Sequence, residues 1–405
     1  MQPTSADPTG PVTPDDRPAV GVGMLDGATC ADPRDMYTSL RTDCPVMRVD
    51  NQVVVSRSKE IEEVLRDPAR FSSAMEAAPL GNVRPLIPLQ IDPPMHVRYR
   101  RILDPLFAPK RVERLEAQID QSVSRLVSSF AAVGHADLVP EFTVPFPSEV
   151  FLALLGLPIA ELPTFLAMKD GIIRPPGTTI GELSRARSAT SQQIYDYFEK
   201  VISERQRAPR DDLISQFLSA EIDGSRLGHD EICDICYLFL IAGLDTVSAT
   251  LECMFAYLAR HPEQRRLMSS EPDIIASAVE ELLRWETPVM GVARVATRDT
   301  ELGGEPVHAG DQVSLLLGAA NIEPSAEGAM GEVDFRRTRN RHIAFGGGVH
   351  RCLGSHLARV ELRVAMRRFH ELIPDYELAP GAELSYSAGI RSIASLPIVF
   401  TPKTD

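Results

Sequence analysis

The residues with the clearest chemical potential lie in a glycine-rich segment near the end of the chain. Residues 345–354 read F-G-G-G-V-H-R-C-L-G, and apolar residues at helical spacing follow them. A cysteine at a helix start meets free N–H groups and the positive end of the helix dipole, and both favour the thiolate that binds metals. The glycines would let the backbone approach a flat cofactor closely. Zinc fits poorly, because Cys352 has no second cysteine nearby and structural zinc takes four ligands.

The pattern F-x-x-G-x-H-x-C-x-G distinguishes this segment from an ordinary glycine-rich turn whose cysteine only fills the core. It resembles the haem-ligand loop of the cytochrome P-450 family at every fixed position. The resemblance implies that the Cys352 thiolate binds the iron of haem b. It also implies that four other residues of the loop contact the haem: Phe345, Gly346, His350 and Gly354.

A second chemical pair, Asp245 and Thr246, lies inside a long apolar helical pattern. An acid beside an alcohol is costly in an apolar run unless it is used, so the pair suggests a proton route. The segment A-G-L-D-T resembles the A-G-x-[DE]-T segment of the same family. That resemblance implies that Thr246 holds dioxygen, that Asp245 relays protons, and that Ala242 and Gly243 contact the haem. The alternative is a threonine bonded back to its own helix and an aspartate that reaches solvent.

Glu281 and Arg284 lie three residues apart on a predicted helix, where they can form an ion pair on one face. They match the E-x-x-R motif of the family, about 70 residues before Cys352. The resemblance implies a third member, Arg337 of D-F-R-R, and a structural role for all three residues in supporting the haem face.

Four basic residues from distant segments are expected to bind the two haem propionates. Residues 92–100, D-P-P-M-H-V-R-Y-R, resemble the family's D-P-P-x-H-x-R-x-R, which places His96 and Arg100 on one helix face. Arg294 and His350 match two further propionate contacts of the family. For His96 and Arg100 the alternative is a solvated basic helix face. The chain departs from the family at A-N-I-E-P, residues 320–324, where A-N-R-D-P is frequent, and this leaves the local pairing open.

Composition and charge limit the class of protein. The chain has 405 residues, of which 44% are hydrophobic, and such a chain is globular with a large core. Acidic residues outnumber basic ones by 56 to 42, so the net charge of −14 disfavours a nucleic-acid partner. Scattered cysteines and an N-terminus without a basic, then apolar, stretch predict a cytoplasmic location. We expect no membrane span, because the longest apolar run, residues 235–244, is about half of the roughly 20 residues needed.

The elements that must position these residues are mostly helices, so the predicted fold is mainly α with small β-sheets, like the cytochrome P-450 fold. Residues 1–20 are expected to be a flexible tail, and residues 21–405 a single domain. The segment 230–260 has no proline and predicts a central helix of about 46 Å over the haem, with Cys233 and Cys236 as core residues. Other predicted elements are helices at 33–42 and 59–66, a helix-dominated block over 93–264, a helix ending near Trp285, a helix after Cys352, and strands at 45–49, 52–56, 289–295, 312–316 and within 385–400.

The substrate side of the haem is expected to be apolar. By position, four residues would line it: Ile241, Val289, Met290 and Ile390. The loop at 75–89 would cover it. Such a pocket fits a hydrophobic substrate of terpenoid, steroid, fatty-acyl or polyketide size. Arg174 and Arg185 near the predicted lid could instead hold a carboxylate, and the sequence does not decide between the two.

The resemblance therefore implies a haem-thiolate monooxygenase that uses O2 to hydroxylate or epoxidise a hydrophobic small molecule. Two electrons, ultimately from NAD(P)H, would come from a separate ferredoxin or flavodoxin with its reductase, docking near Arg101, Lys110 and Arg351. One alternative is a peroxide-driven haem-thiolate oxygenase, although such relatives carry Arg-Pro in place of Asp245-Thr246. The other is a haem sensor or carrier without turnover.

Overall fold

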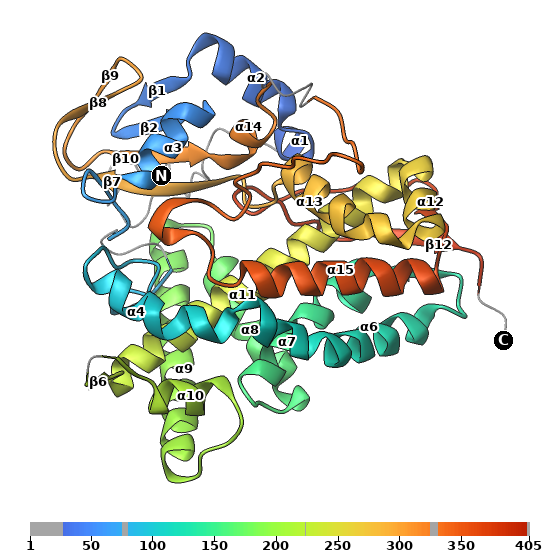
Figure 1. Cartoon of the computed structure of the whole chain (residues 1–405), viewed down its shortest axis with the longest axis horizontal. Coiled ribbons are helices and arrows are strands. Elements are labelled where there is room, and N and C mark those ends of the chain that lie inside the picture. Colours follow the sequence, from blue (N-terminus) through green and yellow to red (C-terminus); the bar gives the residue numbers. More distant parts are fainter. Residues whose placement is uncertain (1–26, 75–79, 223, 325–330, 403–405) are drawn as a thin grey trace, which may run out of the picture.

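The computed structural model describes residues 27–74, 80–222, 224–324 and 331–402, and Figure 1 shows their arrangement. The predicted tail and residues 75–79 of the predicted covering loop lie outside the described residues. Helices make up most of the described chain and the sheets are small, which confirms the predicted fold class. The helices are α1 (Gly27–Ala31), α2 (Arg34–Asp43), α3 (Ser58–Arg66), α4 (Met95–Leu103), α5 (Pro109–Val112), α6 (Glu116–Phe130), α7 (Pro145–Leu154), α8 (Leu162–Ile173), α9 (Ile180–Arg207), α10 (Leu213–Ser219), α11 (His229–Arg260), α12 (Pro262–Ser270), α13 (Ile275–Glu286), α14 (Leu317–Asn321) and α15 (Ser355–Leu372).

The largest sheet has the strand order β1-β2-β10-β7-β3 and is covered by α2, α3 and α14 in Figure 1. Asp50, at a φ of 55°, turns β1 into the antiparallel β2, and β10 joins β2 in parallel. The short hairpins β5–β6 and β8–β9 were not predicted, because strands of two or three residues are too short to show a periodicity. The strands are β1 (Val46–Val49), β2 (Gln52–Val55), β3 (Phe71–Ser72), β4 (His135–Asp137), β5 (Glu221–Ile222), β6 (Ser225–Arg226), β7 (Gly291–Ala296), β8 (Thr300–Leu302), β9 (Glu305–Val307), β10 (Gln312–Leu316), β11 (Tyr376–Leu378) and β12 (Pro397–Phe400).

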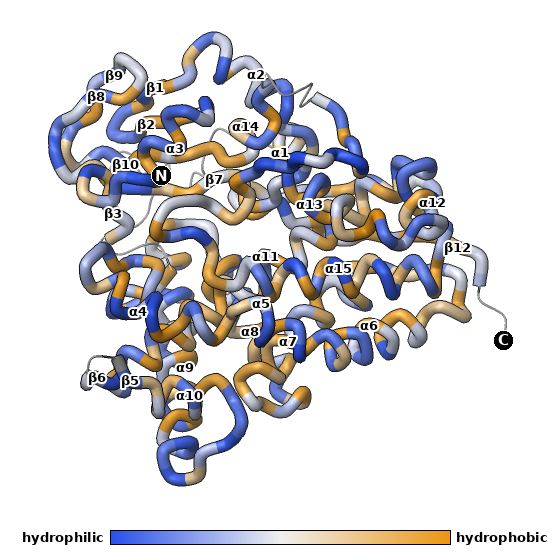
Figure 2. The backbone as a smooth tube through the Cα atoms, in the orientation of Figure 1, coloured by the Kyte–Doolittle hydropathy of each residue, from blue (hydrophilic) through white to orange (hydrophobic). Residues whose placement is uncertain are grey.

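The central helix α11 confirms the prediction for residues 230–260 and contacts α7, α8, α9, α13 and α15. It begins where the side chain of Glu231 accepts a hydrogen bond from the Gly228 N–H, at 2.6 Å. Among the described helices it alone is long and apolar enough to cross a membrane, but 78% of its most apolar window is buried within the protein. Cys233 and Cys236 are buried in an apolar cluster, as predicted. The outer helices α15 and α6 instead alternate between hydrophilic and hydrophobic residues (Figure 2), as amphipathic helices do.

The strand prediction within residues 385–400 is only partly correct. A strand, β12, forms at Pro397–Phe400, whereas residues 386–393 fold back on themselves through a single bridge between Tyr386 and Ile393. The reversal is tight because the Ser387 N–H donates to the Ser392 carbonyl at 3.0 Å and Gly389 adopts a φ of 82°. We call residues 386–393 the C-terminal loop. Its shape brings Ile390 beside Val289, with which it forms a further bridge.

A buried ion-pair network holds α13 against the irregular segment that leads to Cys352. The Arg284 guanidinium donates to both carboxylate oxygens of Glu281, at 2.7 and 2.8 Å, and neither side chain is exposed. Arg337 adds a third contact at 3.1 Å, so the predicted trio does come together. The Asp334 N–H and the Asn340 amide also donate to Glu281, both at 2.9 Å. Burial acts to raise the pKa of Glu281, but these donors together hold it below its usual value.

Residues 320–324, which depart from the family pattern, have a clear local role. The Glu323 carboxylate accepts the Ser58 N–H at 2.7 Å and so satisfies the N-terminus of α3. Asn321 accepts the Ile343 N–H through its side-chain oxygen and receives Arg284 at its carbonyl, at 2.7 and 3.0 Å. The segment therefore joins α3 and α13 to the chain just before the cysteine loop.

Glu281→Gln is expected to destabilise the protein by about 3–5 kcal/mol, because it leaves the buried Arg284 charge unbalanced. The matched control is Glu271→Gln, which removes the partner of Arg336 in a pair whose side chains are 47% and 62% exposed. Exposed pairs contribute about 1 kcal/mol or less. Urea unfolding followed by circular dichroism measures both changes, and equal losses in the two variants would contradict the structural role of Glu281.

Candidate active site

The cysteine loop, residues 345–352, is closed by its own backbone. The Cys352 N–H donates to the Phe345 carbonyl at 2.9 Å. Gly348 has a φ of 63°, and a Cβ atom there would lie 1.9 Å from the Leu65 carbonyl oxygen at the end of α3. Only glycine fits this position, so Gly348 is needed for the close contact between the loop and α3. The expectation that the glycines make room for a cofactor applies to Gly346 and Gly354, where an added Cβ would meet no protein atom within 4 Å.

The sequence led us to expect Cys352 at the start of a helix, but the structure places it before the first turn. The helix α15 begins at Ser355, and Cys352 belongs to the preceding turn. Burial raises the pKa of the Cys352 thiol, while the Gly354 N–H and the nearby Arg100 act against this rise. The protein surroundings alone therefore do not favour the thiolate. A metal ion held by Cys352 would supply the missing positive charge, because metal ions favour the thiolate form of a coordinating cysteine.

Beside this loop lies a cluster of buried basic side chains in which ring nitrogens of two histidines have no hydrogen-bond partner. The rings of His96 and His350 have centroids 4.2 Å apart. Both ring nitrogens of His96 and the Nε2 atom of His350 are buried without a hydrogen-bond partner. Burial lowers the pKa of both rings, that of His350 to about 3, and the neighbouring Arg294 acts in the same direction. Arg294 is itself only 8% exposed. Unpaired buried donors are costly, so this cluster fits an anionic group such as a haem propionate.

Arg100 lies close enough to His96 and His350 for its charge to act on both rings, and its role as a propionate donor stays a prediction. Its guanidinium donates to the Arg351 carbonyl at 2.8 Å and pairs with Asp104 at 2.7 Å. Arg100 therefore ties α4 directly to the cysteine loop, next to the histidine cluster.

Comparison with known proteins agrees with this geometry. The family model described as Cytochrome P450 matches residues 159–276. A probable cytochrome P450 127A1 of Sinorhizobium fredii is 34% identical over 347 residues, which span 85% of this chain and 82% of that protein. This chain belongs to the cytochrome P450 family. Steroid C26-monooxygenase of Mycobacterium tuberculosis is 31% identical over 95% of this chain and 98% of its own length. A solved structure of a mutant of P450 EryK in complex with erythromycin B matches 94% of this chain and 100% of its own, with 28% identity and a TM-score of 0.86.

Membership in the cytochrome P450 family makes this protein a haem-thiolate monooxygenase and implies a haem-iron cofactor. The residues of this chain fit that group, because an accessible cysteine, two open glycine positions and the unpaired histidine cluster meet in one place. A thiolate ligand pushes electron density to the iron and favours O–O cleavage.

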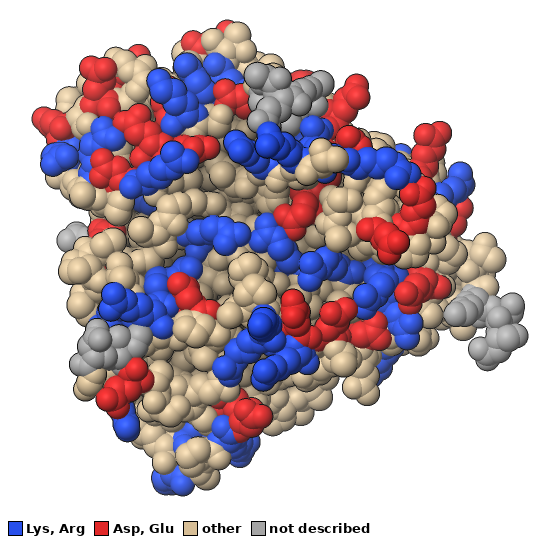
Figure 3. All heavy atoms as spheres, in the orientation of Figure 1, with Lys and Arg blue, Asp and Glu red and all other residues tan. Residues whose placement is uncertain are grey.

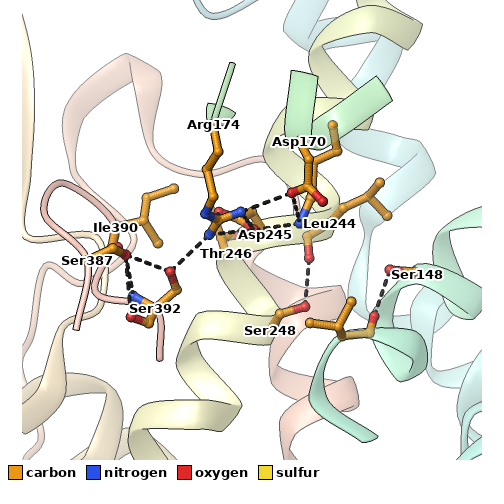
Figure 4. Close-up of polar contacts among 12 residues, drawn as sticks. Ser148, Asp170, Arg174, Leu244, Asp245, Thr246, Ser248, Ser387, Ile390 and Ser392 are labelled. Atoms are coloured by element: carbon orange, nitrogen blue, oxygen red, sulfur yellow. Dashed lines mark hydrogen bonds and ion pairs between the residues drawn. The ribbon is translucent and has the colours of Figure 1, made fainter. Parts of the chain in front are cut away.

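The acid–alcohol pair of this cytochrome P450 lies in the middle of α11, where Figure 4 shows its surroundings. Asp245 is buried, and its carboxylate accepts a hydrogen bond from the Lys169 ammonium group at 3.0 Å. Arg174, directly after α8, approaches the same carboxylate at 3.3 Å and also donates to the Ser392 hydroxyl at 2.9 Å. Asp245 therefore does not reach solvent, which contradicts that part of the alternative interpretation. The Thr246 hydroxyl donates to the Ala242 carbonyl at 2.8 Å, so the helix back-bond of that interpretation does form.

The residues around this pair face different sides of α11. Ala242 and Thr246 remain accessible to solvent on one face. Haem contact by Ala242 and Gly243 stays a prediction. A Cβ atom on Gly243 would lie 3.2 Å from the ring of Phe151 on α7. Because Gly243 has no side chain, α11 and α7 can pack closely. This packing offsets the roughly 1 kcal/mol of helix stability that glycine loses relative to alanine.

Two of the four predicted pocket residues lie elsewhere. Ile241 is buried in the apolar cluster between α9, α10 and α11, and Met290 is buried in a small cluster with Tyr37 and Ile322. Both point into the core because neighbouring residues on a helix or strand face different directions. Val289 and Ile390 are partly accessible and bridge to each other, so they remain candidates for the pocket wall.

The sequence analysis missed the residues that bind Asp245 and the covering loop. Lys169 was not singled out, although it is one of five lysines and lies within the apolar segment F-L-A-M-K-D-G-I-I. A lysine in such a run signals a buried partner. In the described part of the covering loop, Arg84 pairs with Asp234 of α11 at 3.0 Å and stacks over the Tyr195 ring at 4.9 Å. The partners are 111 to 150 residues distant, so no local pattern could reveal them.

Proposed function

We propose that this cytochrome P450 uses dioxygen to hydroxylate or epoxidise a hydrophobic molecule of steroid, terpenoid, fatty-acyl or polyketide size. The observation that carries the proposal is the ion-paired Asp245 beside an accessible Thr246. A carboxylate held in a defined place next to an alcohol suits controlled proton delivery, which a haem sensor would not need. The partly accessible residues on this side are small or apolar: Ala242, Val289, Val292 and Ile390. The similarity to steroid C26-monooxygenase supports a substrate of this kind.

In this proposal Cys352 binds the haem iron, and His96, Arg100, Arg294 and His350 hold the propionates. Phe345 is fixed by the Arg359 guanidinium, which lies 4.5 Å above its ring, and so orients the loop under the haem. Gly346 and Gly354 leave space for the macrocycle. Burial of the histidine cluster excludes water, which strengthens its electrostatic attraction for the carboxylates.

Asp245 and Thr246 would carry protons toward the oxygen side of the pocket. The Asp245 carboxylate can accept or release a proton only after it has exchanged a cationic partner. Arg174 is the partner suited to this exchange, because its side chain is 43% exposed whereas that of Lys169 is 5% exposed. Lys169 would keep the carboxylate in place while Arg174 moves. The Thr246 hydroxyl keeps its own proton on the Ala242 carbonyl and offers its oxygen as an acceptor.

Electrons would come from NAD(P)H through a separate acidic carrier in the cytoplasm. Lys and Arg side chains gather on the face of the molecule that shows α4, α15 and the segment before α15 (Figure 3). Two basic residues of the region are used internally, because Arg98 pairs with Glu231 at 2.9 Å and Arg359 with Glu280 at 2.6 Å. Arg101, Lys110 and Arg351 are exposed there and support the docking of an acidic ferredoxin or flavodoxin.

Titration of the ferric protein with steroids, terpenoids, fatty acids and macrolides tests the substrate class. A substrate that displaces an axial water should move the Soret band with saturable dependence on concentration. One hydrophobic class is expected to do so. A response only to small polar molecules would contradict the proposal, and a protein without a Soret band after haem addition would refute the haem site.

Asp245→Asn is expected to lower product formation on the order of 100-fold, because positioned proton transfer contributes at least that factor. Electrons should then appear as hydrogen peroxide, measured against NADH consumed with a substrate found by titration. The control is Asp170→Asn, which removes an exposed carboxylate that also contacts Lys169 and Arg174, both at 3.1 Å. Unchanged coupling in Asp245→Asn would favour a peroxide-driven enzyme or a sensor.

Arg101→Glu/Arg351→Glu is expected to slow ferredoxin-driven reduction at least tenfold at low salt, with a weaker dependence on ionic strength. The matched control is Arg207→Glu/Arg210→Glu, which makes the same charge change at exposed positions at the end of α9. Stopped-flow reduction under carbon monoxide gives the rate. If both double variants behave alike, the effect is one of net charge and the docking surface lies elsewhere.

A further inference from the structure

The C-terminal loop contacts α11 and its neighbours through three consecutive residues. The Cys253 thiol donates to the Arg391 carbonyl at 3.1 Å, and the Ser392 hydroxyl accepts the Arg174 guanidinium at 2.9 Å. The Ile393 N–H then donates to the Glu252 carboxyl at 2.7 Å. Figure 4 shows that Arg174 lies between Ser392 and Asp245. The loop that carries the pocket candidate Ile390 is thus linked to Asp245 through Ser392 and Arg174, and to Glu252 through the next residue, Ile393.

Glu252 is a buried carboxyl group for which the proposed mechanism has no use. It is 2% exposed and lies seven residues after Asp245, so both project from the same side of α11 about 10 Å apart. Its second oxygen accepts the Thr143 hydroxyl at 3.4 Å. Asp245 has two cationic partners, whereas the described residues place no cation within ion-pair distance of Glu252.

The environment of Glu252 favours its neutral form. Burial raises the pKa of Glu252 to about 7, and the charge of Asp245 acts in the same direction. The Ile393 N–H, Arg174 and Lys169 oppose the rise without cancelling it. On the loop side, Arg391 pairs with Glu286 at 3.0 Å, and burial keeps the adjacent Cys253 thiol neutral by raising its pKa.

The direction of the pH effect follows from linkage. An opening of the loop that hydrates Glu252 returns its pKa to the ordinary value of 4.5. The closed loop binds the proton more tightly than the open loop, so the closed form loses stability as the pH rises toward 7. Above about pH 7 the loss levels off, because Glu252 is then ionised in both forms. Between pH 6 and pH 8 the opening equilibrium should increase about tenfold.

We propose that Glu252 is a positioning residue for Asp245: in its neutral form it fastens residues 390–393 to α11, which keeps Ser392 on Arg174 and Arg174 on Asp245, and its ionisation loosens this link. The inference deepens the proposed function and rests on it for the role of Asp245. The link itself is a property of the resting protein and can be measured without turnover.

Hydrogen–deuterium exchange of the haem-loaded ferric protein tests the link through peptides that cover residues 387–393. After correction for intrinsic exchange, the wild-type segment should exchange about tenfold faster at pH 8 than at pH 6. Glu252→Gln keeps an oxygen for the Ile393 N–H but cannot ionise, so its corrected rates should be equal at the two pH values. Ser248→Ala is the matched control, because Ser248 lies on the same helix between the two acids and donates to the Leu244 carbonyl at 2.8 Å.

Equal wild-type rates at pH 6 and pH 8 would overturn the proposal, and so would a pH dependence that persists in Glu252→Gln. The wild-type comparison decides the matter even if Glu252→Gln does not fold. The peroxide yield of Asp245→Asn is an independent result. If the exchange behaves as expected but that yield is unchanged, the link stands and the proton-delivery role falls.

Discussion

The side chains of Glu281 and Arg284 have no contact with solvent, so each charge depends on the other and on the groups around them. Removing such a pair from water is costly unless every oxygen and guanidinium nitrogen finds a partner. The partners come from the segment that leads to the cysteine loop: Arg337, the Asp334 N–H, Asn340 and the carbonyls of Asn321 and Glu332. These contacts fix the segment before the cysteine loop, which has no regular secondary structure, in one place against α13. The place of Cys352 depends on this constraint.

The glycines of the cysteine loop follow this fixed segment and lead to Cys352. Gly348 allows the backbone to touch α3, and Arg100 holds the loop from α4. The loop is therefore clamped between elements from the first quarter of the chain and the last. This clamp brings His96 of α4 and His350 of the loop into contact, although they are 254 residues apart in sequence. A haem site assembled in this way needs α3, α4 and the cysteine loop to fold together.

The central helix combines an apolar composition with two buried acids, and the protein treats them differently. Asp245 is paired with cations from α8, whereas Glu252 meets only a hydroxyl and a backbone N–H. Burial without a cationic partner favours the neutral form of a carboxyl group, and it raises the pKa of Glu252 to about 7. The C-terminal loop contacts Arg174, a partner of Asp245, through Ser392, and contacts Glu252 directly through the Ile393 N–H. Residues 392 and 393 therefore connect the ion pair of Asp245 with the hydrogen bond of Glu252.

The sequence by itself determined the family and the central helix and predicted Cys352 as the haem ligand, because these rest on residues at fixed local spacing. The family resemblance supplied Arg337, which lies 56 residues from Glu281, as the third member of the ion-pair trio. The sequence did not determine which way residues of α11 and of the segment before β7 face, so Ile241 and Met290, which are buried in the core, were expected in the pocket wall. It also could not reveal Lys169, Arg174 and Ser392 around Asp245, or Glu252 beneath the C-terminal loop. Only the tertiary structure decided these, because the burial and the charge partners of a side chain depend on segments that are distant along the chain and adjacent only once it has folded.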